Sequence, residues 1–197
     1  MILKSLRPEG PGPEAADFER ELIPYLDALY CYAFVFAADA NEAEGWVADA
    51  ILDAHRRWSD REPEIDVRAW LFAVLRAVVT SSLRQNGGFA SKGSTDIPDY
   101  TPIPEIHDSD PRGDFFKVLR SDEILGALKR VPHEFAEVVV LRDIEGLSYA
   151  EIAEITDADI GTTKSRIFRG RHLLQQDLYR SALEKGYRPK AASATER

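Results

Sequence analysis

The sequence predicts an all-α protein made of two small helical domains joined by a flexible linker, the C-terminal domain containing a helix-turn-helix. Apolar residues recur at intervals of three and four in several segments, which is the period of an amphipathic helix. Glycine and proline gather between them in a stretch where no helix or strand is expected. We therefore expect a flexible N-terminal extension at 1–13, helical domains at 14–86 and 114–180, a linker at 87–113 and a tail at 181–197.

Composition excludes several classes of protein. The 197 residues are 44% hydrophobic and 30% charged, and no apolar run has the roughly 18 residues that a membrane span needs. The first 20 residues lack the apolar stretch of a signal peptide. We expect a cytoplasmic protein with no membrane insertion. The single cysteine, Cys31, is expected to be a buried thiol, and the histidines lack metal-ligand spacing, so neither a metal nor a cofactor is expected.

The N-terminal domain is predicted to contain three helices. The first covers 14–37 and should start or bend near Pro24, because proline disrupts a helix interior. The second covers 42–58; besides its apolar face it has a second stripe formed by Trp46, Asp49 and Asp53. The third covers 66–85 and is apolar nearly all round, which is typical of the central helix of a bundle.

The predicted linker at 87–113 is acidic. Asp96, Asp99, Glu105, Asp108 and Asp110 follow one another with no basic residue among them. The segment is longer than most connections, so it is either a solvated spacer or a functional extended segment.

Residues 147–174 predict the helix-turn-helix. Ser148 and Glu151 have the spacing of a capping box at the start of a short helix, and a turn is expected at 157–159. The inward side chains of the two helices are predicted to be Ile152, Ile155, Ile160, Thr163, Ile167 and Leu174. Beyond them, apolar patterning weakens from Leu178 to Tyr187, where we expect a frayed end.

The outward side of the second helix is basic in an otherwise acidic chain. The net charge is −9, yet residues 161–197 alone carry +6. The outward residues are Thr162, Lys164, Ser165, Arg166, Phe168, Arg169 and His172, with Arg171 nearby. A charge run is often only a solvated face, but hydroxyl residues and a positive dipole at the same helix start favour DNA binding. Lys164 or Arg166 would suit guanine edges, and Arg169 and Arg171 would suit phosphates.

Several motifs in this stretch resemble the promoter-reading C-terminal region of extracytoplasmic function (ECF) sigma factors of bacterial RNA polymerase. They are Val131-Pro132, Val139-Val140-Leu141-Arg142, Glu145-Gly146-Leu147-Ser148-Tyr149, Glu151-Ile152-Ala153 and Gly161-Thr162-Thr163-Lys164-Ser165-Arg166. The N-terminal half is similar more loosely, through 43–52 and through Arg68-Ala69-Trp70-Leu71-Phe72.

The resemblance implies a sigma factor, not an enzyme, that binds core RNA polymerase and directs promoter-specific initiation under the control of an anti-sigma factor. It implies polymerase contacts at Glu44, Trp46, Val47, Asp49, Leu52 and Asp53. It implies −10 element contacts at Arg61, Arg68, Arg76 and Arg84, and −35 element contacts at Thr162, Lys164, Ser165, Arg166, Arg169 and Arg171. Trp46 suits an interface anchor if it is exposed, the alternative being a core position. The acidic linker would pass through the polymerase toward its RNA channel, imitating nucleic acid.

Some positions depart from the family pattern. Gly45 and Ala48 stand where an acid and a glutamine are common, and Ala73 and Ala77 where an arginine and an asparagine are common. In the turn, Asp157 and Asp159 replace the usual glycine and proline; aspartate tolerates a left-handed backbone, but two acids there would repel phosphate unless they face away.

Two alternatives remain open. A sigma-like decoy would titrate an anti-sigma factor without melting promoters, and an ordinary regulator would bind operators through the helix-turn-helix. The departures motivate the first, and the second ignores the match at 68–72.

Overall fold

The computed structural model describes residues 13–62, 64–85 and 121–185. Within these ranges every regular element is a helix or a helical turn, which confirms the predicted all-α class. Backbone contacts divide the described residues into two compact units, 13–85 with 150–158 and 121–149 with 159–185. The acidic linker at 87–113 and the N-terminal extension up to residue 12 lie outside the described residues.

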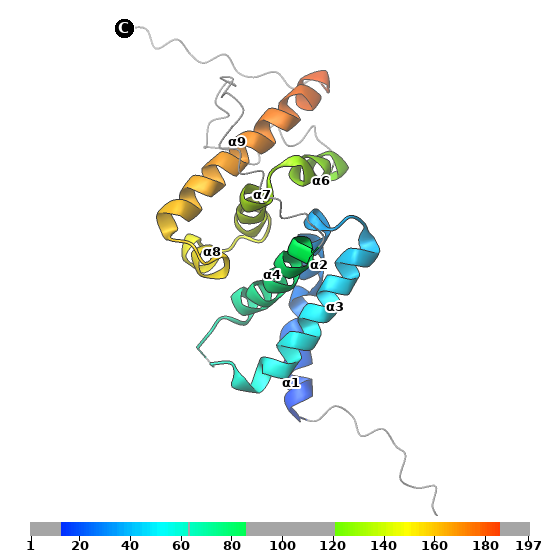
Figure 1. Ribbon diagram of the computed structural model, residues 1–197, viewed down its shortest axis with the longest axis vertical. Coiled ribbons are helices and arrows are strands. Elements are labelled where there is room, and N and C mark those ends of the chain that lie inside the picture. Colours follow the sequence, from blue (N-terminus) through cyan, green and yellow to red (C-terminus); the bar gives the residue numbers. More distant parts are fainter. Residues whose placement is uncertain (1–12, 63, 86–120, 186–197) are drawn as a thin grey trace, which may run out of the picture. The chain divides into compact units, whose positions relative to one another are not determined.

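The first unit is built mainly from four helices, α1 to α4 (Figure 1). They are α1 (Pro13–Leu22), α2 (Leu26–Phe36), α3 (Ala40–Arg57) and α4 (Val67–Gln85), with 3-10 turns η1 (Ile23–Tyr25) between α1 and α2 and η2 (Trp58–Asp60) after α3. The bend expected near Pro24 is therefore present as η1. The helices α2, α3 and α4 pack against one another, and this contact forms the core.

Large side chains of α2 and α4 fill that core. Tyr32 and Phe72 are fully buried with their rings edge to face, 5.7 Å between centroids, and Leu29, Leu75 and Val79 are buried as well. Cys31 is exposed, so the expectation of a buried thiol is wrong. The reason is helical geometry: Leu29 and Ala33, two residues away on either side, take the core-facing positions.

Aspartate side chains begin two of these helices. Asp39 accepts a hydrogen bond from the backbone N of Glu42 at 2.9 Å, and the Glu42 carboxylate accepts one from the backbone N of Ala38 at 2.7 Å. Asp66 accepts from the backbone N of Ala69 at 2.9 Å. These bonds satisfy donors at the start of α3 and α4 that have no partner within the helix.

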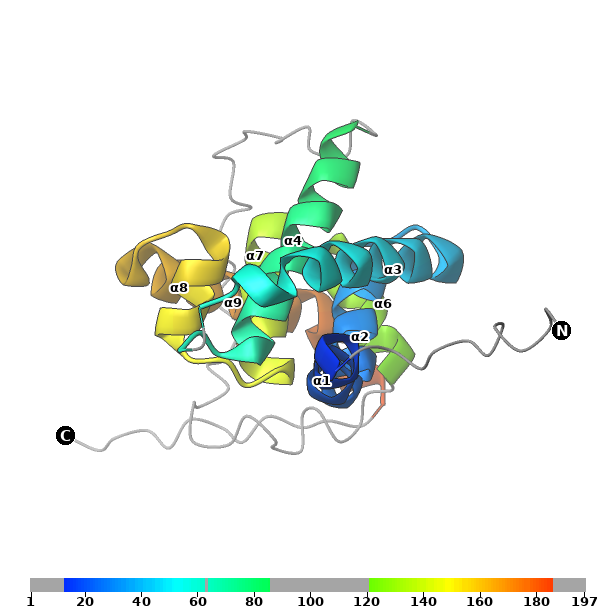
Figure 2. The same ribbon diagram turned by 90° about the horizontal axis from the view of Figure 1, so that it is seen from below.

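The second unit contains α6 (Ser121–Arg130), α7 (His133–Val139), a π-helical turn η3 (Val140–Ile144) and the long helix α9 (Ile160–Glu184); α8 (Tyr149–Thr156) precedes α9 in the chain. Along α9, the first half packs on α7 and the second half on α6 (Figure 1), and Figure 2 shows the same helices from below. Arg130 of α6 forms a bidentate ion pair with Asp177, and Glu123 pairs with Lys185.

The end of α9 corrects one prediction. The helix continues to Glu184, and Leu178 is almost fully buried, so residues 178–184 are not frayed. The contacts with α6 explain the difference, because tertiary packing stabilises a helix end that local sequence alone leaves marginal.

Gly170 sets how closely α7 and α9 approach. A Cβ atom at this position would lie 2.7 Å from the carbonyl oxygen of Phe135 and 2.6 Å from Cγ2 of Val139. Both distances are far shorter than van der Waals contact, so only glycine fits here without a shift of backbone. This contact fixes which side of α9 faces α7.

The described helices include none that is both long and apolar enough to span a bilayer.

Candidate functional site

The turn between α8 and α9 has the predicted length and an uncommon backbone. The first helix ends at Thr156, the second begins at Ile160, and Asp157 has φ of 51°, in the left-handed region. The expectation that Asp157 would accept this conformation is confirmed. Thr156 Oγ1 donates to the carbonyl oxygen of Ile152 at 2.7 Å and caps the end of α8 from within.

The second acid of the turn, Asp159, begins α9 as its cap. Its carboxylate accepts from the backbone N of Thr162 at 2.8 Å and from Thr162 Oγ1 at 2.5 Å. These hydrogen bonds, that from the Thr162 side chain first, hold the pKa of Asp159 below its usual value. The Asp159 charge is directed at its own helix.

The outward side of the first turns of α9 carries the exposed residues. Lys164, Ser165 and Arg169 are exposed, and Phe168 is 69% exposed, the most exposed large apolar side chain of the described residues. We call Lys164, Ser165, Phe168 and Arg169 the open face of α9. Thr163, Ile167 and Leu174 are buried as predicted, but Ile160 is 47% exposed, because it is the first helical residue and projects beyond the packed part.

Arg166 lies at the edge of this face beside a carboxylate. Its Nη2 is 3.7 Å from Oε2 of Glu134, at the start of α7. The two side chains border an open hollow of about 450 Å³, whose other lining residues are Phe135, Gly161, Thr162, Ser165 and Arg169.

Arg171 has a different partner from the one predicted. Its Nε and Nη2 bond the two oxygens of Asp143 in the π-helical turn η3, at 2.9 and 2.5 Å. This bidentate geometry is the strongest form of an arginine–carboxylate contact. To bind Arg171 as predicted, a phosphate would have to displace Asp143, whose ion pair with Arg171 connects η3 to α9.

Two residues outside the predicted DNA contacts, Tyr149 and Arg142, lie beside Lys164. Its Nζ lies 5.6 Å from the centroid of the Tyr149 ring, and Arg142 stacks on the same ring at 4.7 Å. Arg142 also donates to the carbonyl oxygen of Leu147 at 2.7 Å. Periodicity does not reveal this cluster, because it joins residues from η3, the start of α8 and the start of α9.

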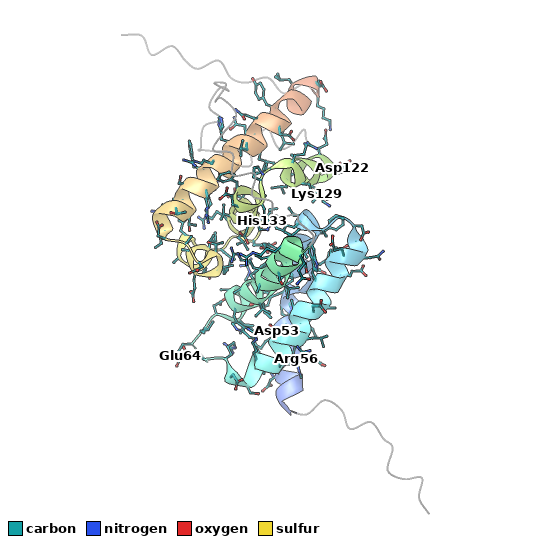
Figure 3. All side chains as sticks on the ribbon, viewed as in Figure 1. Asp53, Arg56, Glu64, Asp122, Lys129 and His133 are labelled. Carbon is teal, nitrogen blue, oxygen red and sulfur yellow. The ribbon has the colours of Figure 1, made fainter. Side chains whose placement is uncertain are left out.

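In the first unit, α3 presents the candidate polymerase surface. Leu52 is 55% exposed, Glu44 and Asp49 are exposed, and Val47 is half-buried. Asp53 is half-buried and pairs with Arg57 at 2.7 Å; Figure 3 labels it together with Arg56 on this helix.

Trp46 is 5% exposed and lies in the core. The interpretation of Trp46 as an exposed anchor is therefore wrong, and the alternative core position is confirmed. The exposed apolar group of α3 is Leu52, and the space around a Cβ built on Gly45 is open, with no atom within 4 Å.

The four arginines predicted for the −10 element are not equivalent. Arg61 is half-buried: its Nη1 donates to the carbonyl oxygens of Ile65 at 2.6 Å and Glu62 at 3.3 Å, and its guanidinium lies 4.7 Å from the Trp58 ring centroid. Arg68, Arg76 and Arg84 follow at intervals of eight residues along α4, and each interval turns a helix by about 80°. Arg68 and Arg84 therefore point in directions about 160° apart and share no single face.

A family model matches the C-terminal helices of the described residues. Residues 121–174 match the family model described as "Sigma-70, region 4". This range contains α6, α7, η3, α8 and the first part of α9, so the whole helix-turn-helix lies inside the matched region.

Longer relatives extend the match to most of the chain. The ECF RNA polymerase sigma factor SigE of Mycolicibacterium smegmatis is 28% identical over 178 residues, covering 89% of this chain and 68% of the relative. EcfG of Rhodopseudomonas palustris is 26% identical over 169 residues, covering 81% and 83%. The sigma factor RpoE of Bartonella quintana, solved in complex with the anti-sigma factor NepR, is similar in structure, with a TM-score of 0.65, 29% identity and coverage of 83% and 97%. The chain is therefore similar to ECF sigma factors over most of its length.

Proposed function

We propose that this sigma factor carries core RNA polymerase to promoters by reading the −35 element with the open face of α9. The observation that supports this most is the exposure of Lys164, Ser165, Phe168 and Arg169 side by side on the second helix of the region 4 match. A helix of this kind fits the major groove, where side chains reach base edges.

The residues of the open face have distinct roles in this proposal. Lys164 suits a guanine edge, since Tyr149 holds it near the start of the helix, and Phe168 suits a thymine methyl group. Arg169 and Ser165 suit phosphates or base edges. Thr162 contributes through its place in the Asp159 cap, and Arg171 positions α9 through Asp143.

For the −10 element we propose a smaller set than the four arginines. Arg68, Arg76 and Arg84 follow the surface of α4 and suit a strand of DNA that winds around the helix, whereas Arg61 holds the 58–66 loop in shape.

For core polymerase we propose the exposed side of α3, with Leu52 at the centre and Glu44 and Asp49 at the rim. Val47 and Asp53 border this surface, and Trp46 supports it from the core.

Substituting Leu52 by arginine would place a charge on the apolar centre of this contact. We expect L52R to lower the affinity for core polymerase and to leave the thermal unfolding of the free chain unchanged.

We further propose that an anti-sigma factor controls this protein, as NepR binds the similar RpoE. The protein then acts as a transcription regulator and not as an enzyme, in the cytoplasm where bacterial RNA polymerase works. The decoy alternative requires the same anti-sigma contact without initiation. The departures from the family pattern at Gly45 and Ala48, both on the exposed side of α3, are the observation that favours it.

Reconstituted transcription tests the proposal. The full chain is mixed with core RNA polymerase, and the complex is used to enrich promoters from random DNA. We expect enriched fragments with two conserved blocks that direct initiation at a fixed start. Binding of an anti-sigma factor without initiation on any fragment would support the decoy instead, and enrichment of DNA by the chain without polymerase would support an operator-binding regulator.

A further inference from the structure

The hollow beside the open face contains a carboxylate where a surface for DNA would be expected to hold only basic and polar groups. Glu134 lies across from Arg166, with 3.7 Å between Oε2 and Nη2, and Arg169, Thr162 and Ser165 line the same hollow. Glu134 is 57% exposed at its side chain, so it serves no core contact, whereas the Arg166 side chain is 30% exposed. The arginine is thus partly withdrawn beside an acid that solvent can reach.

The geometry of this pair differs from that of the other ion pair on α9. Arg171 and Asp143 form two hydrogen bonds at 2.9 and 2.5 Å, which suits a permanent connection. Glu134 and Arg166 attract each other over 3.7 Å, a distance longer than a hydrogen bond. A pair that is solvent-exposed and not hydrogen-bonded separates at little cost.

We propose that Glu134 sets the DNA affinity of the recognition helix by holding Arg166 until a phosphate displaces it. This inference rests on the proposed function, because it concerns the same −35 contact. A phosphate that binds Arg166 must first separate it from Glu134. Part of the attraction between the phosphate and Arg166 is therefore cancelled by the loss of the Glu134–Arg166 attraction. The cost applies to every DNA sequence, whereas a promoter repays it through the base contacts of the open face. Glu134 therefore weakens binding to arbitrary DNA and leaves selection to the residues that touch bases.

The substitution Glu134→Gln tests this inference because it removes the charge and keeps the size of the side chain. The full chain, bound to core RNA polymerase, is titrated against two duplexes: a promoter enriched from random DNA by the wild-type holoenzyme, and an unselected sequence. We expect E134Q to bind both duplexes about two- to five-fold more tightly, as expected for freeing one exposed ion pair. The salt dependence of binding should steepen by about one in log affinity against log salt, because one more phosphate is neutralised.

Two further variants decide whether Arg166 is the intermediary. In the background of Arg166→Gln, the change at Glu134 should bring no gain, since the group that it would release is gone. Glu184→Gln is the matched control; it removes one exposed carboxylate at the far end of α9 and should leave affinity and salt dependence at wild-type values. Circular dichroism and thermal unfolding establish that all variants are folded alike.

Three results would overturn the inference. Unchanged binding by E134Q would mean that Glu134 does not hold Arg166 away from DNA, and weaker binding would mean that Glu134 supports Arg166 on DNA. An equal gain in the R166Q background, or an equal gain from E184Q, would mean that the carboxylate acts only through overall charge. If the wild-type holoenzyme enriches no promoter, the proposed function itself fails and this inference fails with it.

Discussion

At the scale of single residues, the partner of each arginine decides its role. Arg61 and Arg171 both resemble DNA contacts by position, yet each is held by groups of its own unit, Arg61 by the 58–66 loop and Arg171 by Asp143. Arg169 is exposed and has no ion pair among the described residues. The same residue type therefore serves structure at two positions and suits DNA at the third.

The contrast between Arg169 and Arg171 is testable. We expect Arg171→Gln to lower the stability of the chain by about 1 kcal/mol, because it breaks a bidentate ion pair, with an equal effect from Asp143→Asn. Arg169→Gln should leave the melting temperature unchanged and weaken promoter binding by the holoenzyme. Thermal unfolding and DNA titration measure the two effects. If R171Q has normal stability but binds DNA weakly, Arg171 is a DNA contact and not a structural residue.

Arg61 offers a second test at this scale. Arg61→Ala removes both hydrogen bonds to the loop and the stacking on Trp58, so we expect faster proteolysis within 58–66 and slower promoter opening at unchanged −35 affinity. Arg61→Lys keeps the charge but cannot donate from a planar fork, so it should behave like the alanine variant. If lysine restores opening fully, charge on DNA and not the shape of the loop is the function of Arg61.

At the scale of elements, α9 combines recognition with anchoring. Its first half lies on α7 through the close contact at Gly170, and its second half is tied to α6 by the pairs Arg130–Asp177 and Glu123–Lys185. The direction in which the open face points is set by these contacts and not by the helix-turn-helix alone.

Gly170 is the critical position of this element. We expect Gly170→Ala to destabilise the chain by about 1 to 3 kcal/mol, because the added methyl group would overlap Phe135 and Val139, even though alanine favours a helix. Gly126→Ala on α6 is the matched control: its Cβ would meet only the flexible end of Arg130 at 3.4 Å, and we expect it to be neutral or stabilising by up to about 1 kcal/mol. Equal effects in thermal unfolding would contradict the close contact.

The helices themselves were largely predictable from periodicity, and long-range contacts were not. The bend at Pro24, the centrality of α4 and the turn at 157–159 follow from local sequence. The core position of Trp46 does not, because its stripe lies beside the apolar face and helical spacing alone leaves its burial open. Asp143 is 28 residues from Arg171, so no local pattern links them.

At the scale of the whole molecule, charge is divided between two tasks. The chain carries −9 overall, while residues 161–197 carry +6. An acidic protein is repelled by DNA except where its basic helix meets the groove, since phosphate contacts dominate nonspecific affinity. Binding to polymerase would supply the missing attraction.

We therefore expect DNA binding that depends on polymerase. The free full-length chain should bind an enriched promoter at physiological salt no more tightly than an unselected duplex, and the complex with core polymerase should bind it tightly and specifically. Anisotropy titrations with and without polymerase measure the difference. Tight, specific binding by the free chain would show that the acidic surface does not oppose DNA.

Exposed positions alternate along α9 with positions that pack or form ion pairs within the unit, and this pattern is useful for engineering new promoter preferences. Positions 164, 165, 168 and 169 accept diversity at little cost to folding, because their side chains are exposed. Positions 163 and 167 are buried, position 170 allows the close approach of α7, and position 171 forms the ion pair with Asp143. A library that randomises the first set and keeps the second would sample regulatory specificity without spending most of its members on unfolded protein, which is what an orthogonal transcription circuit requires.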